Sequence, residues 1–145
     1  MKRRGLKPLL GLHEMRRRIL KQLLAALRGR AREIEERLEA LRNEGERVRA
    51  WAQARLEAAD GAAEQALALR WRERAHAQAE ALRRSLAETL AEAEDAAKRL
   101  VRASQELKML ASLEARRRER ERSEAERAEQ VRSDELAATR AGAPR

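Results

Sequence analysis

The sequence predicts an all-α fold, an antiparallel two-helix coiled coil (α-hairpin) with a C-terminal helical overhang, and three observations favour it. Charged side chains make up 41% of the 145 residues, and 31 of the apolar residues are Ala, so few large side chains remain for a core. There is no Phe or Tyr, and Val and Ile together number five, which leaves little from which to build a β-sheet. The third observation is that apolar residues recur with helical spacing in two long stretches.

The first helix is expected at about residues 9–58, because its apolar residues recur at steps of three and four. The expected buried stripe is Leu12, Met15, Ile19, Leu23, Leu27, Ala31, Ile34, Leu38, Leu41, Gly45, Val48 and Ala52. From Ala31 onward the steps follow a heptad, whereas the run of fours before it is expected to flatten or reverse the supercoil locally. Pro8 suits the first turn of a helix, which places the start near Leu9.

A turn is expected at about residues 59–62, because Asp60-Gly61 is the strongest turn dipeptide in the interior of the chain. The second helix then covers about residues 63–140. Its expected stripe is Ala75, Ala79, Leu82, Leu86, Leu90, Ala93, Ala97, Leu100, Ser104, Leu107 and Ala111. Two long amphipathic helices joined by a short turn predict one domain, residues 1–145, that folds back on itself as a monomer.

The register of the hairpin follows from the position of the turn. If the chain folds back at Asp60, residues equally distant from Asp60 face each other. The pairs are then Leu38 with Leu82, Ile34 with Leu86, Leu27 with Ala93, Ala52 with Ala68 and Gly45 with Ala75. Apolar residues meet throughout, and many pairs set a large residue against Ala or Gly, so the helices are expected to approach closely.

The sequence becomes polar beyond Leu113, with Val131 and Leu136 as its remaining large apolar residues. Ion pairs at helical spacing, such as Glu114 with Arg118, support an isolated helix. We therefore expect residues 114–145 to form a polar overhang that the hairpin does not need for folding. A helix that is polar all round bridges solvent, is supported by its own charges, or binds a partner.

The net charge is +9, and the excess lies at the N-terminus, where residues 1–18 hold seven basic residues and one acidic residue. In the hairpin this segment lies beside the Arg-rich residues 116–122. One end is therefore basic, which favours docking onto an acidic surface: a protein pore, nucleic acid or anionic lipid. The alternative is that Arg-rich runs only solvate the helices, since 29 Arg against 5 Lys inflate every cluster.

Several kinds of site are not expected. The chain has no Cys for disulfides or thiolate ligands, and no Gly-Lys-Ser/Thr phosphate loop. His13 and His76 are too far apart in the hairpin to share a metal. We expect no enzyme activity, no metal and no cofactor. No uninterrupted apolar run reaches membrane-spanning or signal-peptide length, so a cytoplasmic location is expected.

Trp51 and Trp71 lie on either side of the turn. The two indoles are expected within about one helical turn of each other. They either close the end of the hairpin as an aromatic clamp or form an exposed patch where a partner docks. Neither lies within the basic runs, so nucleic acid binding is not expected.

Two stretches resemble a known family. One is Leu9-Leu10-Gly11-Leu12-His13-Glu14-Met15-Arg16-Arg17-Arg18. The other is Glu129-Gln130 followed by Asp134-Glu135-Leu136-Ala137 and Arg140. With the length and the two-helix plan, these stretches resemble the FliJ/YscO (SctO) family, the central stalk proteins of flagellar and type III secretion export ATPases. The short turn between the helices favours a virulence injectisome over a flagellar system.

The resemblance implies a stalk analogous to the γ subunit of rotary ATP synthases. Its terminal end would enter the pore of the hexameric export ATPase, stimulate hydrolysis that the chain does not perform, and link the ring to the export gate at the inner membrane. Export chaperones are a further implied partner. The implied ATPase-facing residues are Arg3, Arg4, Arg16, Arg17, Arg18, Arg116, Arg117, Arg118, Glu129, Gln130, Asp134, Glu135 and Leu136. The implied gate-facing residues are Trp51 and Trp71.

Two other functions remain open at this point. The chain could be a basic coiled coil bound to nucleic acid or the ribosome, whose binding would weaken steeply with salt. It could also be a purely structural coiled-coil dimer, whose mass would be twice that of the monomer.

Overall fold

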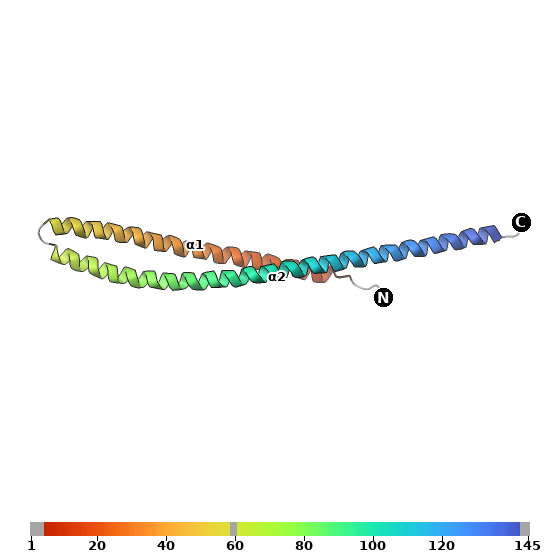
Figure 1. The fold of residues 1–145 in the computed structure, drawn as a ribbon, viewed down its shortest axis with the longest axis horizontal. Coiled ribbons are helices and arrows are strands. Elements are labelled where there is room, and N and C mark those ends of the chain that lie inside the picture. The colour runs from red at the N-terminus through yellow and green to blue at the C-terminus, as the bar shows by residue number, and fades with distance from the viewer. Residues whose placement is uncertain (1–4, 59–60, 143–145) are drawn as a thin grey trace. The chain divides into compact units, whose positions relative to one another are not determined.

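The computed structural model describes residues 5–58 and 61–142. They form two helices, α1 (Lys7–Glu57) and α2 (Ala62–Gly142), with no strand among the described residues (Figure 1). The predicted all-α, two-helix fold is confirmed, and each helix bound lies within two residues of its expected place. Arg3, Arg4 and Asp60 lie outside the described residues.

The two helices contribute to two compact units. The hairpin unit contains residues 19–58 with residues 61–100, and the terminal unit contains residues 5–18 with residues 101–142. Within the hairpin unit, α1 and α2 lie side by side and run in opposite directions (Figure 1).

Most of the buried and half-buried residues of the hairpin unit form one stripe on each helix, which we call the seam. On both helices the steps of three and four nearly always alternate, as in an antiparallel coiled coil. On α1 the seam is Leu20, Leu24, Leu27, Ala31, Ile34, Leu38, Leu41, Gly45, Val48 and Ala52. On α2 it is Ala68, Trp71, Ala75, Ala79, Leu82, Leu86, Thr89, Ala93, Ala96 and Leu100.

The expected stripe before Leu27 is wrong. Those four residues are all exposed: Leu12 by 65%, Met15 by 60%, Ile19 by 57% and Leu23 by 45%. The heptad phase of the later seam continues backwards through the buried Leu24 and Leu20, so the expected run of four-residue steps is not the buried one. The N-terminal part of α1 carries two apolar stripes, and continuity of phase, not the number of large side chains, selects which one is buried.

Two residues of the expected α2 stripe are also wrong, for the same reason. Leu90 is exposed while its neighbour Thr89 is buried, and Ala111 is exposed while Leu110 is half-buried. The Thr89 hydroxyl donates to the backbone carbonyl of Ser85 at 2.7 Å, which satisfies this polar group inside the seam.

The core of the hairpin unit lies far from the turn, and there it confirms the mirror register. Its residues are Leu24, Leu27, Ala93 and Ala96, with Ala97 and Leu100 packed against them. Leu side chains from α1 meet Ala side chains from α2, so the helices can approach closely. Each buried Leu contributes about 1.5–3 kcal/mol through removal of apolar surface from water.

The end of the hairpin is shaped by Gly61. A side-chain carbon at this position would lie 3.2 Å from the Leu56 Cα, so the close approach of the two helix ends would make its contact with the backbone tight. The Gly61 carbonyl accepts the first backbone hydrogen bond of α2, from Gln65, at 2.8 Å. The Gln65 side chain in turn donates to the Ala52 carbonyl on α1 at 3.1 Å.

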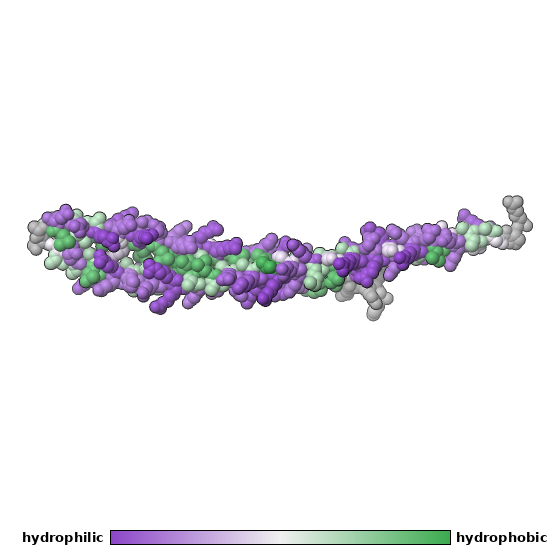
Figure 2. All heavy atoms as spheres, viewed as in Figure 1, coloured by the Kyte–Doolittle hydropathy of each residue, from purple (hydrophilic) through white to green (hydrophobic). Residues whose placement is uncertain are grey.

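In the terminal unit the start of α1 lies against α2. The contacts reach as far along α2 as Arg117, because Leu6 contacts Glu114 and Gly5 lies beside Arg117. Residues 118–142 are exposed apart from the half-buried Ser123, and mostly hydrophilic (Figure 2). The polar overhang is therefore confirmed, but its expected start at residue 114 is wrong. Glu114 is 4% exposed and Arg117 is half-buried, because both contact the start of α1.

Candidate docking surfaces

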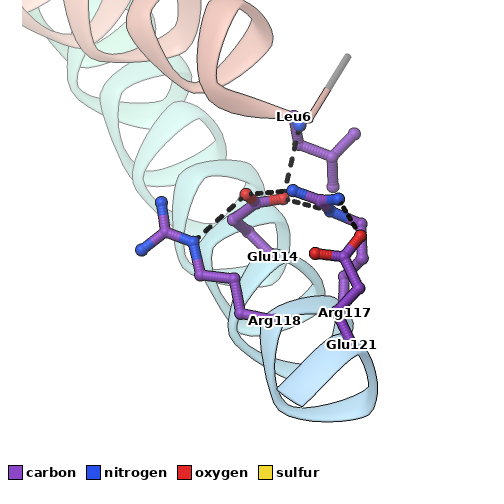
Figure 3. A network of polar contacts seen from close by, with 5 residues as sticks. All are labelled: Leu6, Glu114, Arg117, Arg118 and Glu121. Atoms are coloured by element: carbon purple, nitrogen blue, oxygen red, sulfur yellow. Dashed lines mark hydrogen bonds and ion pairs between the residues drawn. The ribbon is translucent and has the colours of Figure 1, made fainter. Parts of the chain in front are cut away.

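A cluster of polar contacts joins the start of α1 to α2 in the terminal unit (Figure 3). The Leu6 backbone N–H donates to Glu114 Oε2 at 3.3 Å. Arg117 donates to both carboxylate oxygens of Glu114, from Nε at 3.0 Å and from Nη2 at 2.9 Å. Arg118 Nε lies 3.4 Å from Glu114 Oε1, which confirms the expected pair. Glu114 thus makes its polar contacts while almost fully buried.

Glu114 lies on α2 but acts as a capping residue for the start of α1. The first turn of α1 contains no acidic residue, although the free N–H groups and dipole there favour a negative charge. Glu114 supplies that charge. The hydrogen bonds from Arg117, opposed by burial and aided by the Leu6 N–H, lower the pKa of Glu114 from 4.5 to about 2. Glu114 raises the pKa of Arg117 in return.

The Arg117 guanidinium is held by several neighbours. Besides Glu114 it contacts the Glu121 carboxylate, one turn further along α2. Gly5 leaves space for it, since a side-chain carbon there would lie 2.5 Å from Arg117 Nη2. Arg117 therefore differs from the freely exposed cation that an acidic partner surface would contact first.

The other expected ATPase-facing arginines divide in the same way. Arg16, Arg18, Arg116 and Arg118 are exposed, whereas Arg17 is half-buried. On the overhang, all five expected residues are exposed: Glu129, Gln130, Asp134, Glu135 and Leu136. The Gln130 side chain donates to Asp134 Oδ1 at 3.1 Å, so two residues of this set are joined by a hydrogen bond across one turn of the helix.

The two tryptophans have different surroundings in the hairpin unit. The Trp71 indole packs on Gly45, where a side-chain carbon would lie 3.4 Å from two of its ring atoms. Trp51 is 40% exposed. The mirror register places Trp71 opposite Arg49, so Trp71 reaches one turn further along α1 than expected. Gly45 is the position whose missing side chain makes room for the ring.

A groove between α1 and α2 lies in the same part of the hairpin unit. Its volume is 1020 Å³, and Leu38, Leu41, Val48, Trp71 and Ala75 form part of its apolar floor. Trp51 does not line it. The large seam residues here are half-buried, namely Leu38, Leu41, Val48 and Trp71, whereas Leu24, Leu27 and Ile34, further from the turn, are buried. Trp51 thus presents an exposed ring near the turn, and Trp71 is part of the interhelical packing.

His13 of the terminal unit lies in the seam phase of α1 and faces α2. Its Nδ1 atom is 3.7 Å from Glu106 Oε2, too long for a hydrogen bond. His76 is a separate surface residue that lies 3.3 Å from Glu80. Within residues 5–58 and 61–142, no group of three potential metal ligands comes together.

The sequence reasoning missed the role of Glu114. Two signals could have found it: the heptad phase places position 114 in the seam, and the start of α1 has no capping residue of its own. No helix among the described residues is apolar enough over sufficient length to cross a membrane.

Comparison with known proteins gives one finding. The model of a family described as flagellar FliJ protein matches residues 1–145. No curated protein matches the chain, and neither does any solved structure.

Proposed function

Because the chain belongs to the flagellar FliJ protein family, we propose that it is the stalk of an export ATPase. The overhang of α2 enters the central pore of the hexameric ring, and the chain stimulates hydrolysis without supplying a catalytic residue. It also links the ring to the export gate, so it works on the cytoplasmic side of the inner membrane. The matched family is flagellar, which favours flagellar export over the injectisome suggested by the short turn.

The observation that carries this proposal is the form of the overhang. Residues 118–142 continue α2 as a helix beyond the contacts with α1, and their side chains are almost all exposed. Such a helix has no core of its own to bury, so its regular structure depends on ion pairs and on a partner. A narrow, water-lined protein pore is a suitable environment for it.

In this proposal, exposure decides which residues contact the ring. Arg16, Arg18, Arg116 and Arg118 are exposed and can meet acidic groups of the ring. Arg17 and Arg117 act indirectly, since both are half-buried and Arg117 holds Glu114. On the overhang, Glu129, Gln130, Asp134, Glu135 and Leu136 are the exposed contact set.

The proposed mechanism follows from a mismatch of symmetry. A single helix presents different side chains in different directions, whereas a ring of six identical subunits presents the same surface six times. Contacts with one helix therefore differ from subunit to subunit and favour different nucleotide states in each. The gate side of the chain is assigned to the exposed Trp51 and to the groove beside Trp71 in the hairpin unit.

Removal of the overhang tests the proposal. A chain lacking residues 124–145 retains Glu114, Arg117 and Glu121, so its seam and its α1 cap are complete. We expect this chain to remain helical by circular dichroism and to lose stimulation of the purified export ATPase. Unchanged stimulation would remove the overhang from the mechanism.

A finer test replaces side chains without shortening the helix. Replacing Glu129, Gln130, Asp134 and Glu135 by Ala is expected to reduce stimulation of the ATPase. The matched control replaces Glu124 and Glu126, which are exposed on the same overhang, and should leave stimulation unchanged. Equal loss in both variants would indicate a general effect of charge.

A further inference from the structure

Four of the eight large apolar side chains exposed in the terminal unit directly flank the two-helix seam. They are Leu9, 41% exposed, and Leu12, 65% exposed, on α1, with Met109, 65% exposed, and Leu113, 43% exposed, on α2. Each directly precedes a residue in the seam phase: Leu10, His13, Leu110 and Glu114.

These four side chains lie on one face of the terminal unit. A helix turns by about 100° per residue, so a residue that precedes a seam residue lies on one fixed flank of the seam. When two helices pack antiparallel, their preceding flanks fall on the same side. The Leu6–Glu114 bond and the His13–Glu106 contact fix the register. They place Leu9 across the seam from residues 111–113 and Leu12 across from residues 107–110. We call the four residues the apolar flank.

This pattern is typical of a helix that packs against two neighbours. A simple two-helix coiled coil needs two apolar positions in seven, whereas helices in a bundle carry a third, beside the seam. A single exposed Leu needs no explanation. Here four large apolar side chains from two helices share one face, and exposed apolar patches of this kind mark interaction sites. The pattern favours a third helix as the occupant.

The charges in line with the apolar flank indicate the character of that helix. The same row of preceding positions holds Arg16, Arg102 and Arg116, all exposed. Within the terminal unit the one carboxylate described in this row is Glu106, which faces His13 at 3.7 Å. A second copy of the chain would bring arginines against arginines. An acidic helix would pair its carboxylates with them.

We propose that the apolar flank of the terminal unit docks an acidic amphipathic helix of another protein, which packs as a third helix across α1 and α2. Its apolar side chains cover Leu9, Leu12, Met109 and Leu113, and its carboxylates meet the arginines at the two ends of the flank. This site goes beyond the stalk function, because it requires neither the ring nor the overhang.

The test uses the full chain and a designed probe. The probe is a fluorescent peptide of four heptads with Leu at the seam positions, Glu at both flanking positions and Ala or Gln elsewhere. We expect its fluorescence anisotropy to rise on binding, and the affinity to fall as salt is added, because the contacting charges are exposed. The same peptide with Lys in place of Glu should not bind.

Variants locate the site. Leu12→Glu and Met109→Glu each change a side chain that is 65% exposed, so folding should be unaffected, and each should weaken binding of the Glu peptide at least tenfold. The control is Leu136→Glu, which changes a residue of the overhang that is 60% exposed. It should leave binding unchanged.

Three results would overturn the proposal. One is equal binding of the Glu peptide by Leu12→Glu and Leu136→Glu. Another is a wild-type dimer that Leu12→Glu dissociates, which would assign the flank to a second copy. The third is binding to phosphatidylglycerol vesicles that Leu12→Glu abolishes while the Glu peptide fails to bind. None of these measurements involves the ATPase, so they fail or succeed separately from the stalk function.

Discussion

At the scale of single residues, Glu114 has the most consequential environment in the terminal unit. Its carboxylate is buried, yet it accepts hydrogen bonds from Arg117 and from the backbone N–H of Leu6, the residue directly before α1. A buried charge is tolerated only when its hydrogen bonds are satisfied. The same contacts that make burial possible also attach the start of α1 to α2.

Replacement of Glu114 by Gln is expected to lower the free energy of unfolding at neutral pH, because Leu6 and Arg117 lose a charged partner. The pKa of Glu114 is lowered from 4.5 to about 2 in the folded chain. Its stabilising contribution is therefore complete above pH 4.5 and is lost as the pH falls through about 2. Urea unfolding across this range should show the difference between wild type and variant shrink toward pH 2.

The control for this measurement is Glu119→Gln. Glu119 is exposed and pairs with Arg122 at 3.6 Å, a surface contact that contributes little. If Glu119→Gln showed the same dependence on pH, the cap would not be its source.

Glycines offer a second prediction at this scale. Gly29 lies inside α1 with open space where a side chain would begin. Gly29→Ala should raise the free energy of unfolding by about 0.5–1 kcal/mol, because Ala has the higher helix propensity. Gly61→Ala should lower it, because the new carbon would lie 3.2 Å from the Leu56 Cα. Thermal unfolding of both variants measures the two signs, and a gain at both positions would contradict the close approach at the turn.

At the scale of the helices, one continuous heptad phase decides which residues are buried. Leu23 and Leu24 are neighbours with the same chemistry, but Leu24 is 7% exposed and Leu23 is 45% exposed. Leu24→Ala should destabilise the chain by about 2–4 kcal/mol through lost burial and a cavity. Leu23→Ala should change stability by no more than about 0.5 kcal/mol. Urea denaturation distinguishes the two variants. Similar losses in the free energy of unfolding would indicate that Leu23 is buried, as the sequence predicts.

The helices themselves follow from the sequence, because steps of three and four over many turns have no other interpretation. The end of α1 at Glu57 and the start of α2 at Ala62 follow from the turn dipeptide between them, and the register of the core follows from the mirror pairs. The N-terminal part of the α1 seam could not be predicted in the same way. There the stripe of Leu12, Met15, Ile19 and Leu23 contains more large apolar residues than the true seam, which includes His13 and Arg17. Only the continuity of packing along both helices resolves this competition.

The sites were predictable to a smaller extent. The exposure of overhang residues Glu129 to Leu136 could be predicted, because a polar helix with no neighbouring helix exposes its side chains on every face. The burial of Glu114 depends on an N–H group 108 residues away in the sequence, and helical periodicity contains no information about such a contact. Trp71 departs from the expectation because Gly45 provides space for its ring, a property of two residues together.

At the scale of the whole molecule, the seam of one chain is closed by that chain. Leu27 of α1 and Ala93 of α2 already occupy each other's packing surface, so pairing between chains has no free seam to use. We expect light scattering to give a mass of 16.6 kDa at low and high salt. A mass twice as large would indicate a structural dimer.

The position of Glu114 has a consequence for synthesis on the ribosome. The Leu6 amide is made early, and its partner emerges only after a further 108 residues. Because contacts close to the turn require the smallest loops, we expect pairing to spread outward from there and to reach Leu6 last. The first turn of α1 is then without its cap for most of translation. During this time a factor that binds nascent chains can bind this segment.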